Sequence, residues 1–224
     1  MSQIASRIQS IKAELPAHVD LIAVSKFHPV PAILDAYDAG QRLFGENRVQ
    51  ELVDKAPQLP EDIKWHLIGT LQRNKVKYIV PFVHTIQSVD SPKLLDEIER
   101  QCERLGRATI DVLLQIHISG EESKHGFGIE ELKDYLSSGA HKHLSHIRIT
   151  GLMAMASLTE DEEQIRREFA RMQALFTEIK AAHFAESETF RHLSIGMSDD
   201  YPIAIEYGAT YVRVGTKIFG QREY

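Results

Sequence analysis

Short apolar runs alternate along the whole chain with longer segments that repeat apolar residues at helical spacing. Eight of these runs read as β-strands, at residues 21–25, 42–46, 66–70, 84–88, 110–118, 148–155, 192–197 and 211–215. Strands separated by helices pair in parallel, because each crossover returns the chain to the same end of the sheet. Eight such units close into a barrel, so the sequence predicts an α/β fold, a (β/α)8 TIM barrel.

The segments between the runs are predicted to be helices. They cover residues 30–39, 48–56, 72–80, 91–105, 129–138 and 159–185. Ser91 and Pro92 offer a capping hydroxyl and a ring already set for the first helical turn. Thr159 and Glu162 have the spacing of a capping box, which predicts that the longest helix begins at Thr159.

The organisation of the chain predicts one domain. Its 224 residues contain no low-complexity linker, which suits a compact barrel with one additional helix. We expect that helix at residues 1–16, the barrel at residues 20–220, and a single domain over residues 1–224. An open doubly wound sheet is the alternative, but its G-x-G-x-x-G fingerprint does not follow the first apolar run.

Composition narrows the class of partner and the compartment. A formal net charge of −6 and an isoelectric point near 6.0 argue against binding to nucleic acid or to an anionic membrane surface. The single cysteine, Cys102, cannot form an internal disulfide, and no apolar run approaches the roughly 18 residues of a membrane span. We therefore expect a cytoplasmic protein, and a monomer because a closed barrel has no open sheet edge.

Polar residues lie in or directly after several of the runs, and we expect them to gather at the rim that forms the active face of a barrel. They are Lys26, Glu46, Asn47, His66, Gln87, Ser198 and Arg213. A lysine taken at random is usually a solvated side chain. Lys26, however, follows the first run in "LIAVSKFHPV". There the amine is expected to be partly desolvated, which lowers its pKa and favours the neutral form that attacks an aldehyde.

The end of the chain predicts an anion site. Ser198 follows the seventh run, and Gly215 and Thr216 follow the eighth, where barrels commonly hold a phosphate with backbone N–H groups and hydroxyls. Taken alone, Gly215 and Thr216 fit a simple turn and a helix cap equally well. Arg213 lies inside an otherwise apolar strand, and a buried guanidinium requires an acceptor or a bound ligand.

Six stretches of the sequence together point to one family. They are "AVSK", "FGENRVQE", "WHLIGTLQRNK", "KHGFG", "GLMAMA" and "LSIGMSDDYPIAIEYGATYVRVGTKIFG". These motifs resemble, in the same order, those of the YggS/PROSC family of pyridoxal phosphate homeostasis proteins. The resemblance implies a barrel like the N-terminal domain of alanine racemase, which binds pyridoxal 5′-phosphate (PLP) as a Schiff base. It also implies a role in intracellular PLP (vitamin B6) and amino-acid homeostasis.

The resemblance assigns the cofactor-binding residues. They are Lys26, Asn47, His66, Met197, Ser198, Arg213, Gly215 and Thr216. Lys26 would form the aldimine with PLP, and Arg213 would face the pyridine nitrogen. Ser198, Gly215 and Thr216 would hold the phosphate. Two of the remaining residues, the asparagine of "GEN" and the histidine of "WHLIG", would line the ring pocket.

Two functions remain open for such a site. A carboxylate beside the pyridine nitrogen accepts a hydrogen bond from it and holds it protonated, whereas an arginine cannot accept that proton, so the ring is a weaker electron sink. Members of the family are regarded as carriers or regulators of PLP, so we expect a non-catalytic protein that delivers PLP to PLP-dependent apoenzymes. The alternative is a minimal PLP-dependent racemase with Lys26 as one base and His66 or Tyr207 as another. Alanine racemase takes its second group from a following β domain, whereas this sequence stops at Tyr224, which favours the carrier.

Other clusters carry weaker predictions about partners. The basic residues Arg73, Lys75 and Lys77 form our first choice for a contact with a recipient apoenzyme, although most such clusters are solvated surface. Lys124, in "ESKHGFG", is expected near the same rim as Lys26.

The histidines of "HKHLSH" and the single cysteine predict no further site. His141, His143 and His146 match no known zinc spacing, so we expect a solvated loop and no metal. Cys102 lies in a segment of helical period and is expected on a helix face rather than as a nucleophile.

Overall fold

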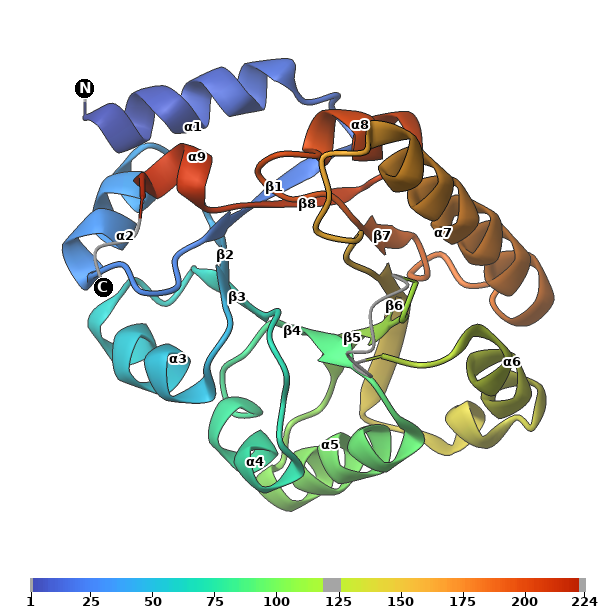
Figure 1. The fold of residues 1–224 in the computed structure, drawn as a ribbon. Helices are drawn as coiled ribbons and strands as arrows, with labels where there is room; N and C mark the ends of the chain where they lie inside the picture. Colours follow the sequence, from blue (N-terminus) through green and yellow to red (C-terminus); the bar gives the residue numbers. More distant parts are fainter. Residues whose placement is uncertain (1, 119–125, 222–224) are drawn as a thin grey trace.

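The eight strands close into a parallel barrel in the computed structural model, which describes residues 2–118 and 126–221 (Figure 1). The strands pair in chain order, and β8 returns to pair with β1, so the predicted TIM barrel is confirmed. The strands are β1 (Asp20–Val24), β2 (Leu43–Glu46), β3 (Lys64–Leu67), β4 (Thr85–Val89), β5 (Ile110–Gln115), β6 (Ile147–Met153), β7 (His192–Ser194) and β8 (Tyr211–Val214).

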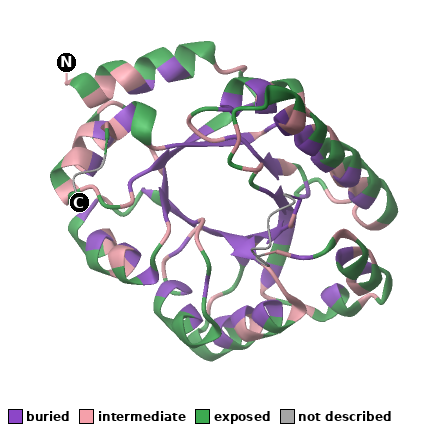
Figure 2. Ribbon diagram, viewed as in Figure 1, coloured by how far each residue is buried: buried purple, intermediate pink, exposed green. Residues whose placement is uncertain are grey.

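Helices surround the barrel and bury their inner faces against it (Figure 2). The α-helices are α1 (Gln3–Glu14), α2 (Val30–Asp38), α3 (Val49–Lys55), α4 (Val76–Ile79), α5 (Pro92–Leu105), α6 (Ile129–Ser137), α7 (Glu162–His183), α8 (Tyr201–Glu206) and α9 (Thr216–Phe219). Three short 3-10 helices are η1 (Ala56–Gln58), η2 (Arg73–Lys75) and η3 (Ala140–His143). The additional N-terminal helix, α1, packs against α2 and α9 and completes the outer ring (Figure 1).

Helix α7 begins later than the sequence predicts. Its first residue is Glu162, and the N-cap is Asp161, whose carboxylate accepts hydrogen bonds from the N–H groups of Glu163 (3.0 Å) and Gln164 (3.2 Å). The hydroxyl of Thr159 instead accepts from the N–H of Asp161 at 3.1 Å. The predicted start at Thr159 is therefore wrong, because the aspartate carboxylate caps the helix and the threonine only shapes the turn before it.

Helix α5 begins at Pro92, as predicted, with Ser91 at the N-cap position. The Ser91 hydroxyl does not cap the helix but donates to a carboxylate oxygen of Asp90 at 3.1 Å. Cys102 lies on the buried face of α5, as expected, and burial raises the pKa of its thiol to about 11. A protonated, buried thiol is a packing residue.

The barrel interior is filled by side chains of two kinds. An apolar cluster contains Ile22, Leu113, Met153 and Tyr211. The fully or almost fully buried polar residues inside the barrel include His66, Gln87, Ser194 and Arg213. Buried polar groups require hydrogen-bond partners, and the Ser194 hydroxyl accepts from Arg213 and donates to Gln87. Within residues 2–118 and 126–221, no helix combines the length and the apolarity needed to cross a membrane.

The histidine-rich segment is not the solvated loop that the sequence predicts. His141 is buried in η3, and its ring packs against that of Phe184 with centroids 5.5 Å apart. His146 contacts a carboxylate oxygen of Glu99 through Nδ1 at 2.9 Å. The histidines serve different packing and hydrogen-bonding partners, and among the described residues no group of three or more His, Cys, Asp and Glu side chains is arranged to hold a metal ion.

Candidate functional site

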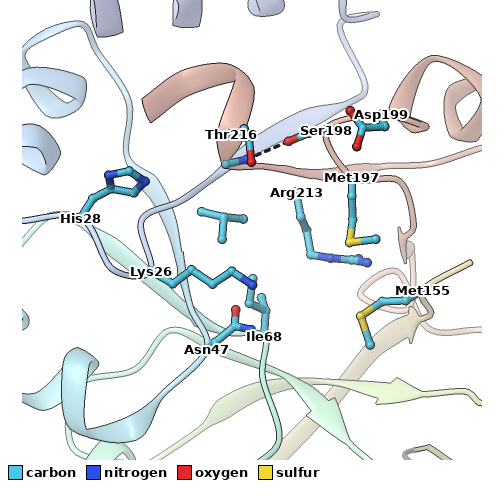
Figure 3. Close-up of a pocket in the computed structure, with 12 residues that line it drawn as sticks. Lys26, His28, Asn47, Ile68, Met155, Met197, Ser198, Asp199, Arg213 and Thr216 are labelled. Atoms are coloured by element: carbon cyan, nitrogen blue, oxygen red, sulfur yellow. Dashed lines mark hydrogen bonds between the residues drawn. The ribbon is translucent and has the colours of Figure 1, made fainter. Parts of the chain in front are cut away.

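A cavity of about 200 Å³ lies at the carboxyl ends of the strands (Figure 3). The structure brings seven of the eight predicted cofactor contacts to its walls, namely Lys26, Asn47, Met197, Ser198, Arg213, Gly215 and Thr216. They come from both ends of the chain, and the pairing of β8 with β1 places them together. The cavity therefore lies where a barrel has its active face.

Lys26 stands on a turn just beyond the end of β1. Its side chain extends into the cavity toward Asn47 and Ile68 (Figure 3). The next residue, Phe27, has a φ of 67°, and no other non-glycine residue of the described chain has a positive φ. This left-handed conformation costs an L-residue roughly 1–2 kcal/mol, so the contacts around the turn must hold it in place.

Arg213 enters the cavity from β8 and is only 4% exposed. Its guanidinium donates to the carbonyl oxygen (2.8 Å) and hydroxyl (2.6 Å) of Ser194 and to the carbonyl oxygen of Ala154 (2.9 Å). These acceptors are all neutral, and burial lowers the pKa of Arg213 to about 10. A buried guanidinium without a carboxylate partner is suited to face an acceptor atom of a ligand.

The wall of the cavity across from Lys26 provides hydrogen-bond donors for an anion. Ser198 follows β7, and Gly215 and Thr216 follow β8. The N–H of Gly215 donates to the Ser198 hydroxyl oxygen at 3.3 Å, which joins the two loops (Figure 3). Two hydroxyls and a backbone N–H at one wall form a donor set suited to a phosphate.

A glycine fixes the loop that carries Ser198. Gly196 has a φ of 89°, and a Cβ at this position would lie 2.6 Å from the Cβ of Ala204. The N–H of Met197 then donates to a carboxylate oxygen of Asp200, which is itself 8% exposed. The chain therefore turns sharply after β7 and presents Met197 and Ser198 to the cavity.

Asn47 contributes a buried acceptor. It follows β2 directly, and its Oδ1 atom is buried without a hydrogen-bond partner among the described residues. The segment after β3 approaches so closely that a Cβ on Gly69 would lie 2.3 Å from the carbonyl oxygen of Asn47. A buried oxygen without a donor is costly, so this atom is suited to accept a hydrogen bond from a ligand.

His66 does not line the cavity. Strand β3 begins two residues before the predicted run, at Lys64, so His66 lies within the strand, fully buried in the barrel. Its Nδ1 is 2.9 Å from Nε2 of Gln87, whose Oε1 accepts from the Ser194 hydroxyl at 2.8 Å. His66 is thus linked to Arg213 through two intervening side chains. Burial, followed by the nearby His84, lowers the pKa of His66 well below its usual value.

Five further residues that the sequence did not indicate also line the cavity. They are Val24, His28, Ile68, Met155 and Asp199. Three of them lie in or beside motifs that were already noted, since His28 is in "SKFHP", Met155 in "GLMAMA" and Asp199 in "GMSDD". The ring of His28 stacks on that of Phe219, with centroids 4.9 Å apart. Val24 and Ile68 are apolar residues at or after strand ends and carry no comparable signal.

The remaining candidate residues lie elsewhere. Tyr207 follows α8 and does not line the cavity. Arg73, Lys75 and Lys77 are all exposed, on η2 and α4. Lys124 lies outside the described residues.

Comparisons with known proteins agree with this geometry. The chain matches the family model described as "Alanine racemase, N-terminal domain" over residues 1–223. The pyridoxal phosphate homeostasis protein of Haemophilus influenzae is 40% identical over 210 residues, which cover 92% of this chain and 86% of that protein. The human pyridoxal phosphate homeostasis protein is 36% identical over 233 residues, with 97% and 84% covered.

Solved structures show the same relationship. PipY of Synechococcus elongatus PCC7942, solved with PLP bound, has a TM-score of 0.89 and 39% identity, and the match covers 97% of this chain and 100% of PipY. Alanine racemase from E. faecalis shares the fold, with a TM-score of 0.75 and 16% identity over 98% of this chain and 58% of that one. The chain therefore belongs to the alanine racemase N-terminal domain family, and within it to the group of pyridoxal phosphate homeostasis proteins.

Proposed function

We propose that the protein holds PLP in this cavity, covalently on Lys26, and serves intracellular PLP and amino-acid homeostasis without catalysing a reaction of its own. The observation that carries the proposal is the convergence of Lys26, Arg213 and the donors of Ser198, Gly215 and Thr216 on one cavity. The homeostasis names of the relatives and the PLP in the PipY structure support the same cofactor.

The residues of the cavity fit PLP chemically. The hydroxyls of Ser198 and Thr216 and the N–H of Gly215 suit the phosphate group. The unpartnered Oδ1 of Asn47 suits the hydroxyl of the pyridine ring, because that hydroxyl can donate the missing hydrogen bond.

Lys26 supplies the covalent link. Its Nζ atom would provide the amine that condenses with the aldehyde of PLP, a reaction that releases one molecule of water. The left-handed turn at Phe27 keeps the amine in the cavity. The aldehyde is thereby protected from reaction with other amines.

Arg213 favours a protein that holds PLP over one that uses PLP for catalysis. PLP supplies an electron sink in enzymes that keep its pyridine nitrogen protonated. A guanidinium is a donor without acceptor capacity, so Arg213 facing that nitrogen leaves it unprotonated. The two groups named for a racemase alternative, His66 and Tyr207, do not line the cavity.

The basic cluster of Arg73, Lys75 and Lys77 is our proposed contact for recipient apoenzymes. Lys75 borders a second pocket of about 290 Å³, which shares Asn47 with the cofactor cavity. Of the three, Lys75 therefore lies nearest to the Asn47 side of the cofactor cavity. Replacing all three with alanine is expected to slow transfer of PLP to an apoenzyme while leaving PLP binding unchanged.

The covalent link is tested by adding PLP to the purified protein, reducing with borohydride and mapping the labelled peptide. We expect an absorbance band of a Schiff base and a label on Lys26. Lys26→Ala should lose both, whereas Lys93→Ala, an exposed lysine on α5, should keep both. A label on another lysine, or no band in the parent protein, contradicts the proposal.

The non-catalytic role has its own test. The PLP-loaded protein is incubated with single-enantiomer amino acids in deuterated water, and deuterium at the α-carbon is measured. We expect no steady exchange above that of free PLP. Steady exchange that disappears in Lys26→Ala would instead establish the racemase alternative.

A further inference from the structure

The turn that carries Lys26 is tied on both sides to a cluster of charged residues outside the cavity. On one side, Nζ of Lys55 donates to the carbonyl oxygen of Ser25 at 3.0 Å, and the Ser25 hydroxyl donates to Oε1 of Glu46 at 2.7 Å. On the other side, the N–H of Phe27 donates to Oε2 of Glu51 at 3.0 Å. The residues before and after Lys26 are therefore bonded to the same three side chains, and the N–H of His28 also closes the turn by donating to the carbonyl oxygen of Ser25 at 3.1 Å.

The three side chains also bind one another. Nζ of Lys55 donates to Oε1 of Glu46 at 2.8 Å and to Oε2 of Glu51 at 3.1 Å. Glu46 ends β2 and is fully buried, while Lys55 is 9% exposed. Glu51 and Lys55 lie one turn apart on α3. A lysine and a glutamate are rarely buried unless they serve each other or a nearby structure.

The cluster carries no net charge when Glu46 holds a proton, because the carboxylate of Glu51 then balances the ammonium of Lys55. Burial, and then its hydrogen bond with Glu51, raise the pKa of Glu46 to about 7. Burial also acts to raise the pKa of Glu51, but hydrogen bonds with Glu46, the N–H of Phe27 and Lys55 outweigh it and lower that pKa. Glu51 is then the anion that pairs with Lys55 and accepts from the turn.

Among the described residues, the groups that shift the pKa of Glu46 besides its burial are Glu51, Lys55 and Ser25. Beyond β1 it faces the hydroxyl of Ser25, and from α3 it faces Glu51 and Lys55. On β3 its register partner is the apolar residue Leu67. The protonation of Glu46 is therefore set by its burial and by α3.

The side chain of Phe27 does not explain its own backbone conformation. It is 39% exposed, and the guanidinium carbon of Arg48 lies 5.0 Å from the centre of its ring. The hydrogen bond from its N–H to Glu51 is a stronger constraint, because the acceptor is a charged group tied to Lys55.

We propose that Glu46, Glu51 and Lys55 are positioning residues that hold the Ser25–Phe27 turn in its left-handed conformation and so direct the amine of Lys26 into the cavity. The proposal rests on the proposed function for the reaction that Lys26 undergoes. None of the three residues is among those that line the cavity.

The test separates the hydrogen bond to Phe27 from the charge of the cluster. Glu51→Ala removes the acceptor, whereas Glu51→Gln keeps a carbonyl oxygen that can accept from the same N–H. Asp54→Asn is the matched control, because Asp54 is an exposed acidic residue on the same helix. Thermal unfolding establishes that each variant is folded.

Three measurements report on the turn. They are hydrogen exchange of the Phe27 amide in protein without PLP, the rate at which acetic anhydride modifies Lys26, and the rate at which PLP attaches to Lys26. For Glu51→Ala we expect faster amide exchange, an altered modification rate and PLP attachment slower by about tenfold. Glu51→Gln should regain most of the parent behaviour, and Asp54→Asn should match the parent.

A folded Glu51→Ala protein with parent values in all three measurements would overturn the proposal. If Glu51→Ala does not fold, the same three measurements are made on Ser25→Ala, which loses only the hydrogen bond from Ser25 to Glu46. Parent values for Ser25→Ala would equally overturn the proposal. If PLP does not attach to Lys26 in the parent protein, the proposed function fails. Amide exchange and acetylation then still decide whether the cluster positions Lys26.

Discussion

The two walls of the cavity are built by different means. Around Lys26, a turn in a strained conformation is bonded to the buried side chains of Glu46 and Lys55 and to the half-buried carboxylate of Glu51. Around Ser198 and Gly215, the wall is shaped by glycine geometry and by hydrogen bonds from the backbone N–H groups of Met197 and Gly215. We call these the amine wall and the anion wall.

The difference follows from what each wall must do. A phosphate is recognised by several donors at once, so the anion wall requires a backbone path that presents its donors to the cavity. A single amine must point in one direction, so the amine wall requires that one turn be fixed. We therefore expect a glycine substitution at the anion wall to lower stability through backbone geometry. At the amine wall, we expect the effect of a substitution on stability to vary with pH.

The largest effect is expected from Gly196→Ala at the anion wall. The new Cβ would lie 2.6 Å from the Cβ of Ala204, at a φ of 89°. Steric overlap and left-handed strain together predict a loss of roughly 3–5 kcal/mol in the free energy of unfolding. Urea denaturation measures it.

Gly106→Ala provides the control for that substitution. Gly106 also has a positive φ, of 67°, but no atom lies within 4 Å of its Cβ position. It should therefore lose only the cost of the left-handed conformation, about 1 kcal/mol. Equal losses at the two positions would show that Gly196 is not sterically required.

The next effect concerns pH at the amine wall. The pKa of Glu46 is raised from 4.5 to about 7, so the folded protein keeps a proton that the unfolded chain releases. This group's contribution to stability is therefore full below pH 4.5 and is lost as the pH rises to about 7. The free energy of unfolding of the parent, relative to Glu46→Gln, should fall by up to about 3 kcal/mol over this range.

The comparison with Glu46→Gln is necessary because buried histidines act in the opposite direction. His66, His84 and His192 have lowered pKa values, chiefly through burial, so their contribution to stability is lost as the pH falls. They are present in both proteins and cancel in the difference. A difference that does not change with pH would show that Glu46 does not hold its proton.

A smaller effect is expected from Ser198→Ala. Loss of one hydroxyl donor should weaken PLP binding by about tenfold, which corresponds to about 1.4 kcal/mol. Stability should change little, because the hydrogen bond from Gly215 to Ser198 is long, at 3.3 Å. Equilibrium titration with PLP measures the affinity, and Ser10→Ala on the exposed face of α1 is the control. Unchanged affinity would remove Ser198 from the anion wall.

The smallest effect is expected from Arg48→Ala. Its guanidinium lies over the ring of Phe27, an exposed cation–π contact worth about 0.5 kcal/mol. Thermal unfolding should show a correspondingly small loss, and PLP attachment should remain near the parent rate. A loss as large as that of Glu51→Ala would mean that the ring contact, rather than the carboxylate, holds the turn.

Much of the site could be predicted from the sequence because its residues follow strands. Lys26, Ser198 and Gly215 come directly after apolar runs, and a parallel barrel brings such positions to one end. His66 could not be placed in this way, since the phase of a short apolar run does not reveal where its strand begins. In the structure His66 is the third residue of β3, and its side chain is fully buried inside the barrel instead of lying at the rim.

The cluster of Glu46, Glu51 and Lys55 could not be predicted from the sequence either. Glu46 was expected among the polar residues at the rim, but the structure buries it against α3. Two carboxyls and a lysine spread over a strand end and a helix give no motif that indicates contact. The bonds among them depend on how α3 packs beside the turn.

The sequence by itself determined the barrel, the order of its elements and the lysine at the end of the first strand. These features are local, because strand and helix periods, caps and strand ends are set by residues that are close in the chain. The tertiary structure decided which side chains meet. Closure of β8 against β1 brings Lys26 and Arg213 to one cavity, and the packing of α3 places Lys55 and Glu51 beside the turn. Such contacts are between residues far apart in the chain, so local sequence patterns do not reveal them.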